Sequence, residues 1–265
     1  TPIDVGADLR ATLYDAGHIL GSAIVAVEHG EEKIVFTGDL GNSPSVLLPD
    51  TEKIEGATYL IMESVYGNRV HPSKIERTEK LLSLVKETIA KKSVLLIPAF
   101  SLERTQTILY ELNTFVEEGK IEPVPVFVDS PLSIKITEIY KQSMDRFNDR
   151  VKARAAAGDD VFSFPKLEFT LWGGESHKIH AYKNPKIIIA SAGMSTGGRV
   201  VTHQEYYLPD PHATILFIGY QAAGSLGRVI QEGAKSVTIK GNTIPIHAHI
   251  ETLTGYSGHT DGPGL

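Results

Sequence analysis

Buried apolar strands alternate with amphipathic helices over most of this chain, and that alternation restricts the fold more than any other feature. After about residue 68, continuous apolar runs are separated by segments with the 3.6-residue spacing of helices. The runs are SVLLIPAF (93–100), VPVFVDS (124–130), KIIIASAGM (186–194) and ATILFIGYQ (213–221). Strands that alternate with helices form a parallel sheet with helices on both faces. The sequence therefore predicts a doubly wound α/β unit.

The first part of the chain has a different pattern. Residues 8–40 contain three short alternating segments joined by glycine-containing turns, which predict an antiparallel, hairpin-rich sheet. TYLIMES (58–64) is a continuous apolar run that ends in polar residues. We interpret it as a buried strand that delivers polar side chains to a site. The chain therefore combines two architectures.

Composition limits the classes of function. The chain has 265 residues and no run of 18 apolar residues, so we expect no membrane span. It has no cysteine, which excludes disulfides, thiolate zinc sites and a cysteine nucleophile, and which is typical of a cytoplasmic protein. The formal net charge of −6 argues against a broad nucleic-acid-binding surface, but it leaves a local basic groove open.

Polar residues gather where the predicted strands end. Asp39, Glu63 and Asp129 each follow an apolar run, and His18 and His259 lie in glycine-containing turns. Each residue taken singly is explained as well by a structural role in a turn. Ligands of α/β sheets bind beyond the carboxyl ends of the strands, so the set as a whole favours a functional site.

The order of these segments resembles that of a known family. The matching blocks are AGHILGSA, FTGDLG, MESVYG, PAFSLERTQ, SAGMSTGGRV, FIGYQAAGSLGR and YSGHTD. They are similar to successive motifs of the β-CASP branch of metallo-β-lactamase-fold nucleases, which includes the pre-mRNA 3′-end cleavage endonuclease and ribonuclease J. The resemblance implies a partial metallo-β-lactamase (αββα) sheet that carries an inserted β-CASP domain. The expected domains are 1–68 and 257–265 for the lactamase part and 69–256 for the insertion.

The resemblance also implies roles for individual residues. His18 matches a zinc-ligand histidine, and Asp39 matches the carboxylate that bridges two zinc ions. Glu63 matches the acidic β-CASP motif, and His259 matches the histidine that protonates the leaving oxygen or stabilises the phosphate. The implied activity is zinc-dependent hydrolysis of RNA phosphodiester bonds with two metal ions, in which Asp39, Glu63 and His259 are catalytic.

One family motif is missing from this sequence. The His-x-His-x-Asp-His motif that precedes the His18 block in the family is absent, and only His18 and Asp39 match metal ligands. A catalytic zinc usually takes three protein ligands. We therefore expect a fragment truncated at both ends, which by itself binds little or no zinc and is inactive. We also expect exposed sheet edges, through which the chain could self-associate.

Substrate contacts are expected at the glycine-rich loop SAGMSTGGR. Backbone N–H groups and small side chains at a helix start suit a phosphate, so Ser191, Ser195 and Arg199 are predicted substrate-binding residues, together with Arg104. The resemblance implies single-stranded RNA as the substrate. A structural reading, with turn glycines and surface arginines, stays open for the residues taken alone.

Two other functions are compatible with the sequence. One is a non-catalytic β-CASP module that binds RNA or acts as a scaffold, and the other is a small-molecule hydrolase of the broader fold. His247 and His249 have a His-x-His spacing, but no Asp-His follows, so we expect solvent-facing strand residues. Surface or capping roles are expected for His29, His71, His177, His180, His203 and His212.

Overall fold

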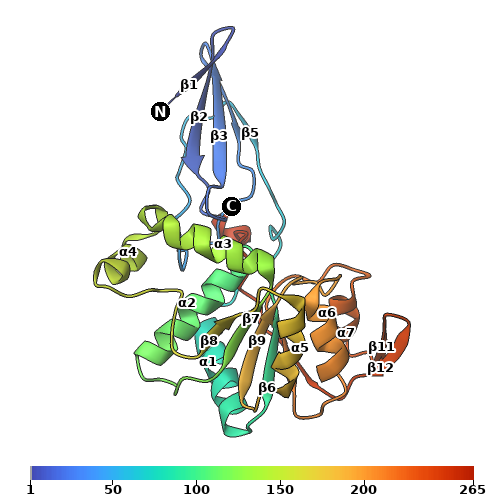
Figure 1. Ribbon diagram of the computed structural model, residues 1–265. Coiled ribbons are helices and arrows are strands. Elements are labelled where there is room, and N and C mark those ends of the chain that lie inside the picture. The colour runs from blue at the N-terminus through green and yellow to red at the C-terminus, as the bar shows by residue number, and fades with distance from the viewer. Residues whose placement is uncertain (1) are drawn as a thin grey trace. The chain divides into compact units, whose positions relative to one another are not determined.

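A computed structural model describes residues 2–265 and separates them into two compact units (Figure 1). Unit 1 comprises residues 2–71, 143–159 and 257–265, and unit 2 comprises residues 72–142 and 160–256. No helix within residues 2–265 is long and apolar enough to cross a membrane.

Unit 1 is built on a sheet with the strand order β1-β2-β3-β4-β5. The strands are β1 (Ile3–Gly6), β2 (Leu9–Asp15), β3 (Ala23–His29), β4 (Glu32–Phe36) and β5 (Tyr59–Ile61). The first three pairings are antiparallel, as predicted, whereas β4 and β5 are parallel. A small core of Ile24, Ala26, Val35 and Leu40 lies on one face of this sheet. The assignment of this unit to the metallo-β-lactamase fold stays a prediction.

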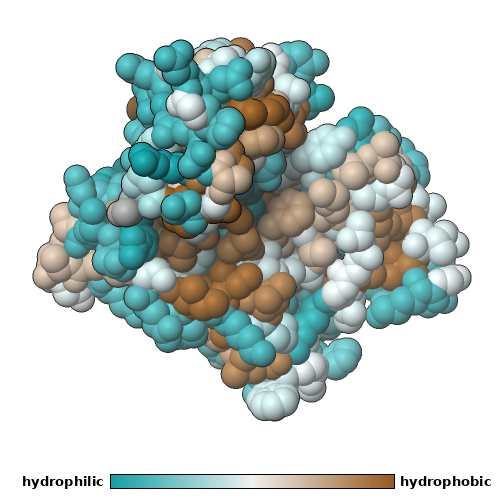
Figure 2. Space-filling model, turned by 90° about the horizontal axis from the view of Figure 1, so that it is seen from above, coloured by the Kyte–Doolittle hydropathy of each residue, from teal (hydrophilic) through white to brown (hydrophobic). Residues whose placement is uncertain are grey.

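The prediction that 58–64 forms a buried strand is wrong. Tyr59, Leu60 and Ile61 are 54%, 56% and 52% exposed. The reason is that β5 is an edge strand, which pairs only with β4 in the described residues. Hydrophobic surface interrupts the hydrophilic surface of the molecule in the view from above (Figure 2). Self-association through such edges stays a prediction.

Unit 2 contains the predicted parallel sheet. In the described part of the chain its strand order is β13-β10-β6-β9-β7-β8, and all neighbouring strands are parallel. The strands are β6 (Val94–Pro98), β7 (Val126–Asp129), β8 (Leu167–Phe169), β9 (Lys186–Ala190), β10 (Thr214–Phe217) and β13 (His249–Thr252). A hairpin of β11 (Ser236–Ile239) and β12 (Asn242–Pro245) lies outside this sheet.

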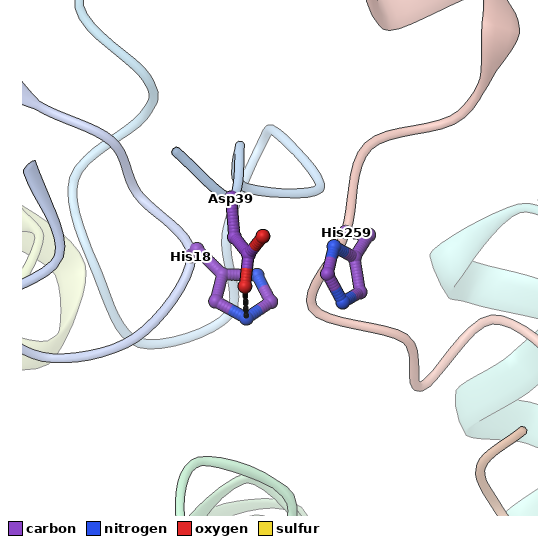
Figure 3. A group of neighbouring side chains, drawn as sticks. All are labelled: His18, Asp39 and His259. Carbon is purple, nitrogen blue, oxygen red and sulfur yellow. Dashed lines mark ion pairs between the residues drawn. The ribbon is translucent and has the colours of Figure 1, made fainter. Parts of the chain in front are cut away.

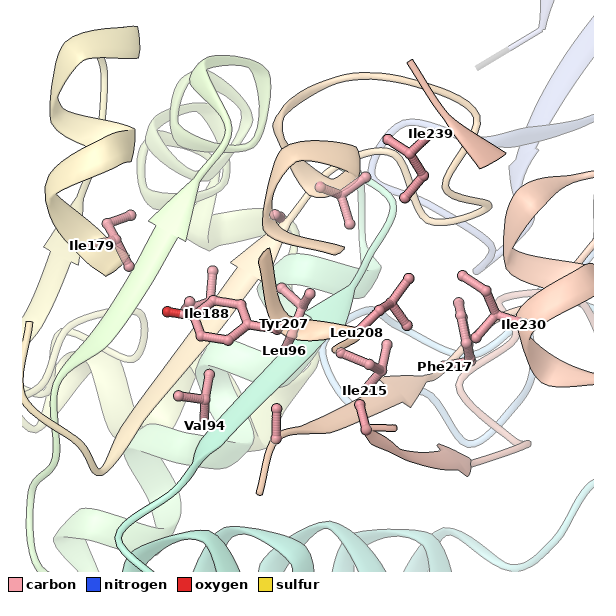
Figure 4. Packing of buried hydrophobic residues seen from close by; sticks show 14 of the residues in the cluster. Val94, Leu96, Ile179, Ile188, Tyr207, Leu208, Ile215, Phe217, Ile230 and Ile239 are labelled. Carbon is pink, nitrogen blue, oxygen red and sulfur yellow. The ribbon is translucent and has the colours of Figure 1, made fainter. Parts of the chain in front are cut away.

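Helices follow the strands of unit 2. They are α1 (Lys74–Ala90), α2 (Arg104–Glu117), α3 (Pro131–Gln142), α5 (Gly173–Ala181), α6 (Arg199–Tyr207) and α7 (Leu226–Gln231). Leu95, Leu96 and Ile97 have no exposed surface, so both faces of the sheet are buried. On one face, residues of α5, α6 and α7 pack on β6, β9 and β10 (Figure 4). This is the doubly wound arrangement that the apolar runs predict.

A buried polar cluster connects the first and last segments of unit 2. Arg77, in the first turns of α1, donates to the carbonyl oxygen of Gly255 over 3.0 Å and to Glu111 over 2.5 Å. Its guanidinium also lies 4.0 Å from the centre of the Tyr256 ring, and the Tyr256 hydroxyl donates to Glu111. Pro72 and Gly255, near the two ends of the unit, are in contact through this arrangement.

The segment after α3 belongs to unit 1, although the predicted insertion includes it. The helix α3 ends at Gln142, and Phe147 lies beyond it. The short helices η1 (Met144–Arg146) and α4 (Asp149–Ala156) follow. The Asn148 amide donates to the carbonyl oxygens of residues 45, 46 and 48. These long-range bonds hold the segment in unit 1.

Candidate functional site

His18 lies in a tight turn between β2 and β3 of unit 1. The Ser22 hydroxyl accepts hydrogen bonds from the backbone N–H groups of His18 (3.1 Å) and Ile19 (3.2 Å). Gly17 and Gly21 have φ values of 65° and 85°, in the left-handed region that glycine adopts at low cost. The turn is therefore fixed by its own residues, and only 8% of the His18 surface is exposed.

Asp39 lies beside His18 because two glycine backbones are in contact. The N–H of Gly41 donates to the carbonyl oxygen of Ala16 over 2.7 Å. A Cβ atom on Gly41 would lie 2.2 Å from the carbonyl oxygen of Gly17, so a side chain has no room there. As a result, His18 Nε2 and Asp39 Oδ2 lie 3.8 Å apart.

Glu63 reaches the same place because β4 and β5 are parallel and end at the same edge of the sheet. The backbone N–H of Glu63 donates to the Thr37 hydroxyl over 3.1 Å, just beyond the end of β4. One of its carboxylate oxygens accepts from the N–H of Leu40 over 2.5 Å. The Glu63 side chain is only 6% exposed. It is therefore held beside the turn that carries Asp39.

His259 joins the site from the other end of the sequence. Gly41 and His259 form an antiparallel bridge, and the N–H of Thr260 donates to the carbonyl oxygen of Leu40 over 2.9 Å. Both Glu63 carboxylate oxygens lie 3.2 Å from His259 Nδ1. The rings of His18 and His259 have their centres 4.4 Å apart (Figure 3).

Three of these side chains could hold a metal ion. Ligand atoms of His18, Asp39 and His259 all lie within 4.8 Å of one another. Two imidazoles and one carboxylate are a donor set that suits zinc, and three protein ligands are the usual number for a catalytic zinc. The structure thus brings together all four residues predicted for the catalytic and metal site. It also places His259, predicted as a proton donor, within reach of the same metal position.

His71 is part of this site, although the sequence predicts a surface or capping role. Its backbone N–H donates to Asp261 Oδ2 over 2.8 Å, and its Nε2 lies 3.1 Å from the carbonyl oxygen of His259. A carbonyl oxygen only accepts, so Nε2 carries the proton. The ring of Tyr66 packs 4.8 Å from that of His71. No local pattern around His71 points to this contact, because its partner is 188 residues away in the sequence.

Arg199, a predicted phosphate ligand, is engaged inside unit 2. Its guanidinium donates to Asp129 Oδ1 over 2.6 Å and to the carbonyl oxygens of Thr170 and Leu171, both over 2.8 Å. Asp129 has no exposed surface and also accepts from His203 (2.7 Å). Arg199 therefore neutralises a buried carboxylate, and the prediction that it binds phosphate has no support from this placement.

Burial and hydrogen bonding act in opposite directions on the Asp129 carboxyl. Burial raises its pKa, but hydrogen bonds from His203, Ser176 and Arg199 outweigh burial and lower the pKa below its ordinary value. His203 itself has no exposed surface, which contradicts the expected surface or capping role. The Asp129 cluster is consequently a buried ionic network of unit 2.

The other predicted substrate contacts, Ser191, Ser195 and Arg104, differ in exposure and in position. Ser195 is 1% exposed, and its hydroxyl accepts from the Gln204 amide over 2.7 Å, so it is not accessible to a phosphate. The Ser191 hydroxyl is half-buried, 2.8 Å from that of Ser101. Arg104 is the first residue of α2. Ser191 and Arg104 remain predicted contacts.

The His-x-His pair is as expected from its spacing. His247 and His249 are exposed, whereas Ala248 between them is buried. His249 Nε2 lies 2.8 Å from Glu251 Oε1. The pair is not among the groups of three or more residues in 2–265 that could hold a metal.

Comparisons with known proteins show that this chain is similar to proteins whose names describe them as ribonucleases. The Beta-Casp domain family matches residues 105–230. Ribonuclease TTHA0252 of Thermus thermophilus is 33% identical over 263 residues, which are 97% of this chain and 61% of that protein. An RNase J-like protein of Methanocaldococcus jannaschii is 32% identical over 257 residues, which are 96% of this chain and 59% of the relative.

A further relative and a solved structure agree with these matches. Transcription termination factor FttA of Pyrococcus horikoshii is 33% identical over 97% of this chain and 41% of its own length. The chain thus spans between about two fifths and three fifths of these curated relatives. The crystal structure of a protein of unknown function from Enterococcus faecalis covers 98% of the chain with a TM-score of 0.52 and 12% identity, which supports the fold alone.

Proposed function

Because the chain belongs to the β-CASP family of metallo-β-lactamase-fold nucleases, we propose that it carries metal-binding and proton-donating residues for hydrolysis of RNA phosphodiester bonds. The observation that carries the proposal is the meeting of His18, Asp39, Glu63 and His259 at one end of the unit 1 sheet. These residues come from four separate segments of the sequence. Their convergence is difficult to explain by the needs of local folding alone.

We assign the metal to His18 and Asp39. A zinc ion there would supply Lewis acidity toward the phosphodiester and acidify a water molecule at neutral pH. The turns around both residues are fixed by backbone contacts, so the two ligands are positioned in advance. Among the described residues, His18, Asp39 and His259 form the only group whose ligand atoms lie this close together, and three ligands are too few to complete two tetrahedral zinc ions.

We assign proton transfer to His259. Glu63 faces Nδ1 of the imidazole, so it fixes the orientation of the ring. Nε2 is then the nitrogen that can donate a proton to the leaving oxygen of the RNA. A carboxylate on one ring nitrogen is also the usual support of a histidine that binds metal through the other. If His259 only donates a proton, its replacement should leave zinc affinity unchanged. If it binds the metal, its replacement should lower zinc affinity.

The test measures zinc affinity and RNA cleavage in the same set of variants. An end-labelled single-stranded oligoribonucleotide is incubated with zinc-loaded wild type, D39N, H259A and H29A, where His29 is an exposed control on the same sheet. Zinc affinity is measured by competition with a chromogenic chelator. We expect D39N to lose both zinc and cleavage, H259A to lose cleavage only, and H29A to behave as wild type.

Two other results would change the proposal. Loss of zinc in H259A would make His259 a ligand and leave the proton donor unassigned. Zinc-loaded wild type that binds the oligoribonucleotide without cutting it would favour the alternative, a non-catalytic RNA-binding module. The four converging side chains favour the enzyme.

A further inference from the structure

Three exposed aromatic side chains lie along one edge of the unit 2 sheet. Phe100, Trp172 and Tyr220 follow β6, β8 and β10 within two or three residues of the last strand residue. The sheet is parallel throughout, so the carboxyl ends of these strands share one edge. The exposed fractions are 36%, 72% and 51%. We call these three residues the aromatic edge.

The strand order sets the spacing of the aromatic edge. β10 and β6 are neighbours, so Tyr220 and Phe100 belong to strands about 5 Å apart. β8 is three positions from β6, or about 14 Å along the edge. In the described part of the chain, none of the three rings contacts another aromatic ring. Their exposed surface is therefore available to a ligand.

Phe100 is held in place by two glycines. A Cβ atom on Gly193 would lie 2.9 Å from the Phe100 ring, and one on Gly219 would lie 3.4 Å from it. The first distance leaves no room for a side chain, so Gly193 allows the ring to lie directly on the backbone. A rigidly supported ring with exposed surface is costly to keep in water, and it loses little entropy when a flat group stacks on it.

Three serine hydroxyls lie between β6 and β8 on the same edge. Ser191 Oγ is 2.8 Å from Ser101 Oγ and 3.0 Å from Ser133 Oγ. Three hydroxyls carry three protons, and these two hydrogen bonds use two of them. Ser133 is buried, so the O–H that is left can meet an acceptor from outside, such as a phosphate oxygen, only at Ser101 or Ser191. The helices α2, α3 and α6 also begin at this edge, and their positive ends favour an anion.

We propose that the aromatic edge binds single-stranded RNA by stacking bases on Phe100, Tyr220 and Trp172, with the backbone phosphates turned toward the half-buried Ser101 and Ser191. Stacking suits RNA of any sequence, because every base has a flat face. Along the strand order, the serine hydroxyls lie between Phe100 after β6 and Trp172 after β8. The inference rests on the proposed function, since it names the surface that holds the substrate.

The experiment measures RNA binding in the presence of a chelator. The chelator removes the metal, so that the RNA is not cleaved and metal binding does not contribute to the measured affinity. The probe is a labelled ten-nucleotide single-stranded RNA, and its affinity is measured by fluorescence anisotropy. We expect F100L and Y220L each to weaken binding by about 5- to 150-fold, because leucine keeps apolar packing but removes stacking. The matched control is F36L, since Phe36 is 43% exposed on the sheet of unit 1, and it should bind as wild type.

The only tryptophan of the sequence gives an independent readout. Stacking of a base on Trp172 should quench its fluorescence as unlabelled RNA is added, and W172F should remove the signal and weaken binding. Thermal unfolding of each variant confirms that it is folded.

Two results would overturn the proposal that the aromatic edge binds RNA. One is equal RNA affinity of F100L and F36L, and the other is Trp172 fluorescence that saturating RNA does not change. If zinc-loaded wild type cleaves RNA while either result holds, only the aromatic edge is wrong. If wild type neither binds nor cleaves RNA, the proposed function fails as well.

Discussion

The imidazole of His71 lies 3.1 Å from the carbonyl oxygen of His259 and donates a hydrogen bond to it. This contact fixes the backbone of the proposed proton donor, whose ring faces Glu63 through Nδ1. The hydrogen bonds of His71 go to the Asp261 carboxylate and to this carbonyl oxygen. It is therefore a positioning residue in the proposed reaction.

Replacement of His71 should lower the rate of cleavage and leave RNA binding unchanged. In H71A the His259 turn loses one fixed point, and small misplacements of a catalytic group cost about 10- to 100-fold in rate. We expect kcat for an oligoribonucleotide to fall by that factor, with KM unchanged. H212A, at an exposed histidine, is the control. An unchanged kcat in H71A would show that Glu63 alone is sufficient to orient His259.

Substitution of Gly41 should unfold unit 1 around the metal site. The methyl group of G41A would lie 2.2 Å from the Gly17 carbonyl oxygen, so the two turns must separate. We expect the free energy of unfolding to fall by about 3 kcal/mol and zinc binding to be lost. Chemical denaturation measures the first and chelator competition the second. G174A has open space around the added methyl group and should be neutral, so equal behaviour of the two variants would contradict the close contact.

The zinc content of the chain should not exceed one ion. His18, Asp39 and His259 are the only described group that could bind it, and the loss of His18 should weaken binding by at least about 100-fold. Plasma mass spectrometry after dialysis against a weak chelator gives the stoichiometry. Two ions per chain would mean that other residues, with His247 and His249 as the first candidates, complete a second site.

Substitution of Arg199 should reduce stability and leave RNA affinity unchanged. R199A leaves the buried Asp129 carboxylate without its arginine partner, which should cost about 3 kcal/mol of unfolding free energy. R228A breaks an exposed pair with Glu232 and should cost less than about 0.5 kcal/mol. If R199A is as stable as wild type but binds RNA more weakly, the phosphate role predicted from the sequence is correct.

Glu103 should make the stability of unit 2 depend on pH. This residue is 6% exposed and is the central residue of a turn with φ of 61°, closed by a hydrogen bond from the Arg104 N–H to the Leu102 carbonyl oxygen. Burial raises the pKa of its carboxyl from 4.5 to about 7, although the Tyr140 hydroxyl donates to it and opposes the shift.

The direction of the effect follows from the raised pKa of Glu103. Its stabilising contribution is complete below pH 4.5 and is lost as the pH rises through 7, because the folded state retains the proton longer than the unfolded state. Relative to wild type, E103Q should gain stability between pH 5 and 8, up to about 3 kcal/mol. Denaturation at several pH values tests this. E138Q, at an exposed glutamate of α3, should follow wild type.

The sequence predicts well those features that depend on local pattern. The parallel sheet of unit 2 follows from its apolar runs, and the turns of His18 and Asp39 follow from their glycines. The roles of Glu63 and His259 are assigned only through the resemblance to a family, since nothing in the spacing of residues 196 apart shows that they meet. The structure then provides the missing link, which is the backbone pairing of Gly41 with His259.

The failures of prediction arise where a distant partner decides the outcome. The apolar segment at Tyr59 looks like a buried strand, yet it is exposed because a strand at a sheet edge has a neighbour on one side only. No local pattern indicates the pairing of the Arg199 guanidinium with Asp129, which is 70 residues earlier, and the phosphate role of Arg199 stays a prediction. Phe100 shows no signal at all, because its support comes from Gly193 and Gly219, in the loops that follow β9 and β10.

The buried cluster around Arg77 has a consequence for the order of folding. Glu63 and His259 are separated by 196 residues, and closing a flexible loop of that length costs about 5 kcal/mol of chain entropy. Arg77 and Gly255 hold the first and last segments of unit 2 together once that unit has folded. The long loop is then already closed, and the remaining search is confined to a few linking residues. Unit 2 should consequently fold first, and the metal site should form late, as a product of its closure.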